Sequence, residues 1–147
     1  MIKILNLTEN TDELTVSAKD SISSADIVFV QSDSISCYDR LCSLNSNIRS
    51  LDFLYEDAED FNDLVKKAVS YLRENSGSLD CVFLCLGGIQ ENRIVSELSV
   101  NDGAVTLPSL SNADICIAFS KAYFCTDAVL RVAFHSLDSI CVTGYEA

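Results

Sequence analysis

The stretch Asp80-Cys-Val-Phe-Leu-Cys-Leu-Gly87-Gly88 decides the fold class of this chain. A run of apolar residues ends abruptly in two glycines, and a polar segment compatible with a helix follows over residues 89–98. This pattern is typical of a buried parallel strand that delivers the chain to a loop at the carboxyl end of the strand. Ligands bind at such loops in open α/β sheets, and glycine there allows positive φ and close approach of the backbone.

Strand and helix patterns alternate along the rest of the chain. Strands are predicted at residues 2–7, 26–31, 48–51 and 80–86, with further candidates at 104–107, 114–119 and 139–143. Helices are predicted at residues 13–23, 34–44, 57–75, 91–98 and 126–134, and Gly77 lies just past the strongest of them. The alternation predicts an α/β fold, with a mainly parallel sheet of about five strands and helices on both faces. We expect a single domain over residues 1–147, because no interdomain linker is evident.

Composition and charge exclude several classes of partner. Hydrophobic residues make up 48% of the chain and charged residues 22%, as in an ordinary globular protein. The net charge is -12, so we expect neither nucleic acid nor an anionic membrane surface as a partner, since phosphates attract basic surfaces. No apolar run approaches the roughly 18 residues that a membrane span needs.

The seven cysteines predict buried free thiols in a cytoplasmic protein. Cys81 and Cys85 share one face of their strand pattern, and the chain has no Cys-x-x-Cys pair and a single histidine, His135. A zinc site is therefore not predicted. His135 follows an apolar helix pattern, and we interpret it as a surface residue at a helix end rather than a catalytic base.

Acidic residues gather ahead of the strongest helix pattern. Mg²⁺ binds carboxylates of this kind. We interpret them instead as the solvated start of a helix, because negative charge complements the helix dipole there. The residues concerned are Asp57, Glu59, Asp60 and Asp63. The sequence thus predicts neither a catalytic residue nor a metal ligand.

Several landmarks along the chain occur in an order that resembles a known family. Leu14-Thr15 follows the first strand pattern, Ala25-Asp26 precedes the second, and Gly87-Gly88 ends a later one. Phe124-Cys-Thr-Asp127-Ala128 follows further along. This order resembles that of the tetrapyrrole (corrin/porphyrin) methylases, in which a first strand leads to a Gly-x-Gly-Pro-Gly loop and a later strand ends in Pro-Gly-His-Pro or Pro-Gly-Asp-Pro.

The resemblance covers most of this chain but only the first of the two domains of the family. It is similar to the methylase-like domain that is fused ahead of a MazG-type nucleotide pyrophosphohydrolase. In such methylases S-adenosylmethionine lies between the two domains, so the resemblance implies this cofactor and a site at the carboxyl ends of the first and fourth strands. We expect those two turns to lie side by side at one edge of the sheet. The residues implied are Asn6, Thr8, Asn10, Gly87 and Gly88.

The chain departs from the family pattern at the loops that would hold the cofactor. The glycines of the first loop are replaced by Asn6, Thr8 and Asn10, and in the second loop Leu86 stands for the proline and Gly88-Ile89 for His/Asp-Pro. Asparagine tolerates left-handed backbone conformations, but added side chains oppose close approach of a ligand. The third loop of the family has two placements here, residues 107–111 or 121–124, and the second is favoured slightly.

Three functional hypotheses follow. The first is a degenerate methylase-like domain that serves as a non-catalytic binding or assembly module, with a homo-oligomer or a fused or second domain as its partner. The second is a fragment of an S-adenosylmethionine-dependent tetrapyrrole methyltransferase, which we expect to be inactive on its own because half of the cofactor cleft is missing. The third is an unrelated α/β domain that binds another small molecule.

Overall fold

A computed structural model describes the chain over residues 1–8, 10–89 and 91–110. These residues all belong to the first of the two units into which the chain divides, Met1–Asn112 and Ala113–Ala147. The elements predicted at residues 114–119, 126–134 and 139–143, the alternative third loop at 121–124, and His135 lie outside the described residues.

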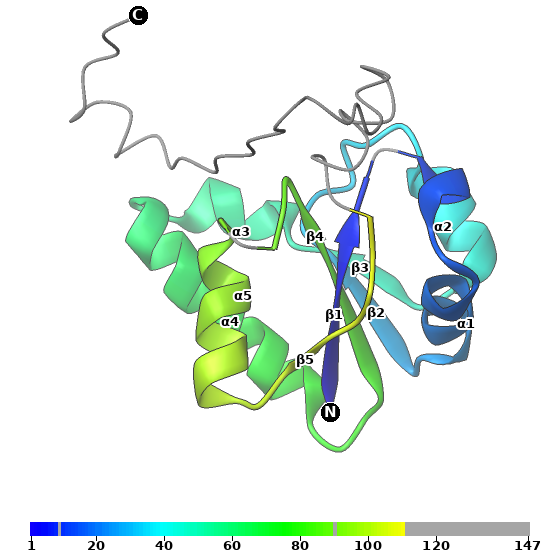
Figure 1. The fold of residues 1–147 in the computed structure, drawn as a ribbon. Helices are drawn as coiled ribbons and strands as arrows, with labels where there is room; N and C mark the ends of the chain where they lie inside the picture. Colours follow the sequence, from blue (N-terminus) through cyan, green and yellow to red (C-terminus); the bar gives the residue numbers. More distant parts are fainter. Residues whose placement is uncertain (9, 90, 111–147) are drawn as a thin grey trace, which may run out of the picture. The chain divides into compact units, whose positions relative to one another are not determined.

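Five parallel strands form one sheet, in the order β3-β2-β4-β1-β5 (Figure 1). Their bounds are Ile2–Leu7 for β1, Ile27–Val30 for β2, Ile48–Ser50 for β3, Cys81–Leu86 for β4 and Val105–Thr106 for β5. The central strands β2, β4 and β1 are almost entirely buried, because helices cover both of their faces. This explains their continuous apolar sequences. The predicted parallel α/β fold is confirmed.

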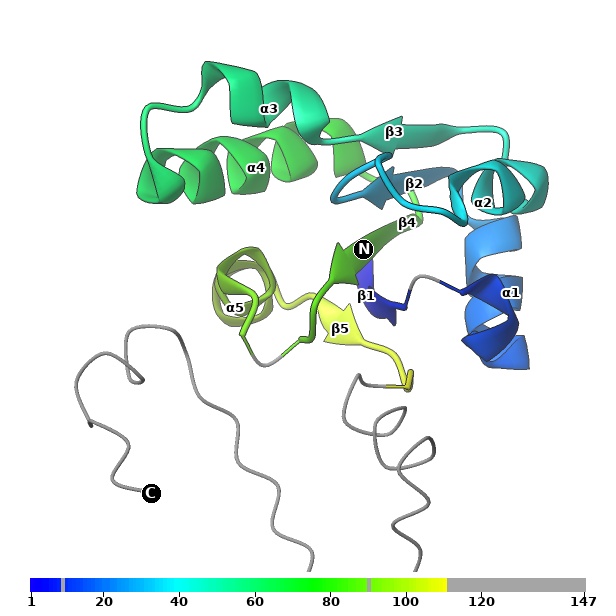
Figure 2. The same ribbon diagram turned by 90° about the horizontal axis from the view of Figure 1, so that it is seen from above.

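Helices cover the sheet in two layers, which are seen on either side of it in Figure 2. Helices α1 (Val16–Ser24) and α2 (Tyr38–Leu44) pack on one face, around a core that includes Leu5, Val28 and Leu84. Helices α3 (Asp52–Asp57), α4 (Phe61–Ser76) and α5 (Arg93–Asn101) pack on the other, around Phe29 and Phe83. Alternate residues of each strand therefore supply two separate cores.

Helix α4 illustrates how local sequence sets the bounds of an element. The Asp60 side chain accepts a hydrogen bond from the Asp63 amide at 2.8 Å and caps the helix. Gly77, with φ of 46°, follows the last turn as predicted. The prediction of one helix over 57–75 is wrong at its start, because α3 ends at Asp57 and α4 begins at Phe61. Lys67 pairs with Asp57 at the end of α3, across this junction, and with Asp63 within α4.

Three other helices begin later than predicted. Helix α5 begins at Arg93 rather than at residue 91, and it ends at Asn101 rather than at residue 98. Thr15 caps α1 by accepting a hydrogen bond from the Ala18 amide at 3.1 Å, so the preceding residues form a separate 3-10 helix, Thr11–Glu13. Helix α2 begins at Tyr38 rather than at residue 34. Among the described residues, no helix has the length and apolarity needed to cross a membrane.

The register of β1 against β4 places the two predicted loops together. Residues pair in parallel from Ile2 with Cys81 to Leu7 with Leu86. The carboxyl ends of these two central strands are therefore adjacent at the same end of the sheet. This confirms the expected position of the two turns.

Candidate functional site

The end of β1 is covered by the chain itself. Asn6 is only 3% exposed. Its backbone amide donates to the Ser109 hydroxyl at 3.3 Å, and its side-chain Nδ2 donates to the Leu110 carbonyl at 2.9 Å. The segment that follows β5 thus lies against this strand end, and the amide of Leu107 continues the pairing by donating to the Ile4 carbonyl. A ligand at the end of β1 would have to displace residues 107–110.

The next two predicted site residues also make hydrogen bonds within the chain. Thr8 is buried, and its hydroxyl donates to the Asn10 carbonyl at 3.2 Å. The Asn10 side chain accepts from the Asp12 amide at 3.0 Å and caps the 3-10 helix. Asn10 also borders a separate cavity of about 260 Å³ beside Arg40, which neither Gly87 nor Gly88 lines.

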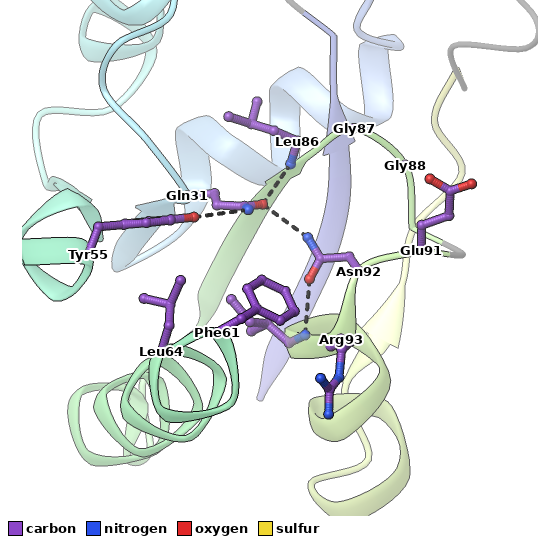
Figure 3. Close-up of a pocket in the computed structure, with 11 residues that line it drawn as sticks. Gln31, Tyr55, Phe61, Leu64, Leu86, Gly87, Gly88, Glu91, Asn92 and Arg93 are labelled. Atoms are coloured by element: carbon purple, nitrogen blue, oxygen red, sulfur yellow. Dashed lines mark hydrogen bonds between the residues drawn. The ribbon is translucent and has the colours of Figure 1, made fainter. Parts of the chain in front are cut away.

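The end of β4 opens instead on a cavity of about 210 Å³, which we call the β4 hollow (Figure 3). Gly87 and Gly88 have φ of 85° and 121°, as the sequence predicted for this turn. The lining comes from the ends of β2 and β4, from α3, and from the first turns of α4 and α5. It consists of Gln31, Tyr55, Phe61, Leu64, Leu86, Gly87, Gly88, Glu91, Asn92, Arg93 and Ile94.

Gln31 connects the walls of the β4 hollow (Figure 3). Its Oε1 accepts hydrogen bonds from the Leu86 amide and from the Asn92 side chain, both at 3.0 Å. Its Nε2 donates to the Tyr55 hydroxyl at 3.3 Å. The side-chain amide of Gln31 thereby fixes the ends of β2 and β4 relative to α3 and α5.

The start of α5 places a cation at the edge of the β4 hollow. Asn92 caps the helix, since its Oδ1 accepts from the amides of Ile94 and Val95 at 3.1 and 3.2 Å. The guanidinium of Arg93 lies 5.6 Å from the centroid of the Phe61 ring and donates to Asn62 Oδ1 at 2.7 Å. This is the geometry of a cation over an aromatic face.

Three of the four thiols within the described residues, those of Cys37, Cys81 and Cys85, are buried as predicted, and the prediction is wrong for Cys42. Cys81 and Cys85 are fully buried on one face of β4, as predicted, while Cys42 on α2 is exposed. Burial raises the pKa of the Cys85 thiol to about 12, so it is a poor nucleophile at neutral pH. Its Sγ lies 4.0 Å from Asn6 Oδ1, at the boundary between the two strand ends.

The five predicted site residues therefore fall into different surroundings. Gly87 and Gly88 border the β4 hollow, Asn6 and Thr8 are buried under the chain, and Asn10 lies at the other cavity. Sequence reasoning missed Gln31, Tyr55, Phe61 and Arg93. The apolar, amide and cationic groups of the β4 hollow suit reversible binding. Among the described residues 1–8, 10–89 and 91–110, no group of three His, Cys, Asp or Glu side chains gathers as a metal site would.

Comparison with known proteins adds no family: no family model matches the sequence, and no curated protein matches it significantly. The parallel five-stranded α/β fold is thus what is established for this chain.

Proposed function

We propose that this chain is a degenerate tetrapyrrole methylase-like domain that acts as a non-catalytic binding or assembly module. The proposal joins the sequence landmarks, which resemble the first domain of those methylases, to a parallel α/β fold of the kind the resemblance implies. A resemblance of fold alone would support no function. The proposal therefore depends on the loops at the ends of β1 and β4.

The observation that carries the proposal is the covered end of β1. Asn6 and Thr8 are 3% and 7% exposed, and their hydrogen bonds run to Ser109, Leu110 and Asn10 of the same chain. A cofactor that needs the backbone of this loop would lose those hydrogen bonds and would meet side chains in place of glycines. Each buried polar group left without a partner costs about 1–3 kcal/mol, which opposes cofactor binding at this strand end.

The assembly part of the proposal rests on exposed aromatic side chains of α3 and α4. Phe53, Tyr55 and Phe61 are 49%, 46% and 59% exposed. Tyr55 and Phe61 both border the β4 hollow, and exposed apolar side chains that lie together are typical of contacts with another chain or domain.

The binding part rests on the β4 hollow, which is the open cavity beside the predicted glycines. Its volume of about 210 Å³ is smaller than the roughly 300–1,000 Å³ of drug-sized ligand sites. The hollow therefore suits one ring or a short fragment of a ligand rather than a whole S-adenosylmethionine.

Titration calorimetry with S-adenosylhomocysteine tests the proposal. We expect no saturable heat at micromolar concentrations, because the β1 end is closed and the β4 hollow is too small. A dissociation constant of about 1 μM or tighter, which corresponds to about -8 kcal/mol, would show that the cofactor site is intact and would favour the methyltransferase fragment. Circular dichroism of the same sample provides the control that the chain is folded.

A further inference from the structure

A second cavity lies between α4 and α5, next to the β4 hollow. We call it the helix groove; its volume is about 390 Å³. Val65 and Val69 contribute apolar surface, and Asn62 and Ser70 contribute neutral polar groups. Its charged residues are Lys66, Arg73, Arg93 and Glu97.

The cations of the helix groove contrast with the chain as a whole, which carries a net charge of -12. Half of the eight Lys and Arg side chains in the described part of the chain form an ion pair with a carboxylate, namely Lys3, Arg40, Lys67 and Arg73. Lys66 has no such partner among the described residues, and Arg93 bonds to the neutral Asn62 amide. Two cations without a carboxylate partner therefore line one groove of an acidic protein.

Two other charged residues of the helix groove, Arg73 and Glu97, already have hydrogen-bond partners. Asp102 holds Arg73 through two hydrogen bonds of 2.7 and 2.8 Å. Glu97 accepts a hydrogen bond from the Asn101 side chain at 2.8 Å. Lys66 and Arg93 are the lining cations that form no ion pair among the described residues, so an incoming anion would gain most beside them. The carboxylates of Glu97, in the groove, and Asp63, near Lys66, oppose that anion in part.

Arg93 connects the two cavities, because it lines both of them. Its guanidinium lies over the Phe61 ring, which borders the β4 hollow, and bonds to Asn62, which borders the helix groove. Figure 3 shows Phe61 inside the hollow, with Tyr55 on the opposite wall and the Glu91 carboxylate directed away from Arg93. Aromatic surface and positive charge are thus adjacent.

We propose that the β4 hollow and the helix groove together bind a small molecule that joins a flat aromatic ring to a phosphate, such as a nucleoside monophosphate. The ring lies against Tyr55 and Phe61, where stacking on an aromatic face is favourable. The phosphate lies between Lys66 and Arg93, whose guanidinium matches phosphate geometry. The inference rests on the proposed binding function and names its ligand class.

Amide NMR titration of the full chain with AMP, adenosine and inorganic phosphate tests the proposal. We expect AMP to bind with a dissociation constant below about 1 mM and to shift the amides of Phe61, Lys66 and Arg93. Adenosine and phosphate should each bind more weakly, since each satisfies only half of the site. Binding of AMP should weaken as salt rises, because salt screens exposed charge.

Substitutions at exposed positions separate the two halves of the site. Arg93→Gln should weaken AMP about tenfold or more, since hydrogen bonds to charged groups are worth about 1.5–3 kcal/mol. Phe61→Ala should weaken AMP about fivefold or more. Because Arg93 lies over the Phe61 ring, phosphate binding should weaken as well, but less than AMP binding. Lys19→Gln is the matched control: it removes one cation from α1, on the opposite face of the sheet, and should change nothing.

Three results would overturn the inference. They are the absence of AMP-dependent shifts at the helix groove, equal affinity for AMP and phosphate, and equal weakening by Arg93→Gln and Lys19→Gln. Tight S-adenosylhomocysteine binding would overturn the proposed module function without giving any of these three results, so the two failures are distinguishable.

Discussion

The ends of β1 and β4 are neighbours at one edge of the sheet, yet their surroundings are opposite. The end of β1 lies under residues 107–110, while the end of β4 opens on a cavity (Figures 1 and 3). The difference arises in the residues that follow each strand. After β1 come Thr8 and Asn10, whose side chains bond to their own chain, and after β4 come two glycines without side chains. Adjacent parallel strand ends therefore do not by themselves make a shared pocket.

The largest expected effect compares two leucines that pair in register across these strands. Leu7 is 2% exposed and belongs to the core under α1 and α2, whereas its partner Leu86 is only partly buried. Leu7→Ala should lower the free energy of unfolding by about 2–5 kcal/mol, as core truncations do. Leu86→Ala should cost about 1 kcal/mol, because less apolar surface is lost. Urea unfolding of both variants measures the difference, and equal losses would contradict the contrast between the two strand ends.

An intermediate effect is expected at the polar residues that define each end. Asn6→Ala removes the hydrogen bond to the Leu110 carbonyl in a buried place, so it should cost about 1–3 kcal/mol. Gln31→Ala also removes hydrogen bonds, but water in the open β4 hollow can replace them, and we expect a loss below about 1 kcal/mol.

Hydrogen exchange adds a local measurement to the Asn6 comparison. If the Asn6 side chain holds the segment after β5 in place, Asn6→Ala should accelerate exchange of the Leu107 amide, which donates to Ile4. Gln31→Ala serves as the control and should leave that amide unchanged. Acceleration in both variants would mean that the segment responds to global stability alone.

The smallest effect concerns Cys85 and appears only at alkaline pH. Burial raises the pKa of the folded-state thiol to about 12 from an ordinary value of 9.0. The unfolded chain therefore releases this proton first, so the stabilisation is fully present below pH 9.0 and is lost as pH rises through about 12. At about pH 9.5 the loss amounts to about 0.8 kcal/mol. Urea unfolding across this range, with Cys85→Ala as the control, should show the extra loss only in the unmodified chain.

The sheet was predictable from sequence because its strands carry redundant signals. Strand β1 occupies residues 2–7 as predicted, and β4 ends at the two glycines that were expected to end it. Continuous burial of these strands demands apolar residues at nearly every position, so the pattern is difficult to mistake. The strongest helix was predicted for the same reason, through the apolar stripe of α4 and Gly77 at its end.

Elements whose sequence carries fewer signals were not predicted, or their bounds were predicted wrongly. Helix α3 has six residues, too few to show helical periodicity, and it ends close to the start of α4. Asp60, three residues ahead of Asp63, is the local capping signal that separates the two helices. The spacing of this pair predicts the observed start of α4.

The candidate site was predictable only in part, because its walls come from segments distant in the chain. The glycines after β4 identified one wall from local sequence. In the sequence, nothing distinguishes Gln31 from other polar residues that follow a strand. Its hydrogen bonds to Leu86 and Tyr55 form only in the tertiary structure. The covering of Asn6 by residues 109–110 depends on a contact across more than a hundred residues, which no local pattern encodes.

The outermost strands of the described sheet are its shortest, β3 with three residues and β5 with two. Pro108 follows β5 closely and has no amide hydrogen to donate. Short edge strands present few unpaired backbone groups to a strand of another molecule. Natural sheets use this feature to avoid edge-to-edge aggregation. For the described residues, we therefore expect another molecule to bind through side-chain contacts rather than by pairing with an edge strand of the sheet.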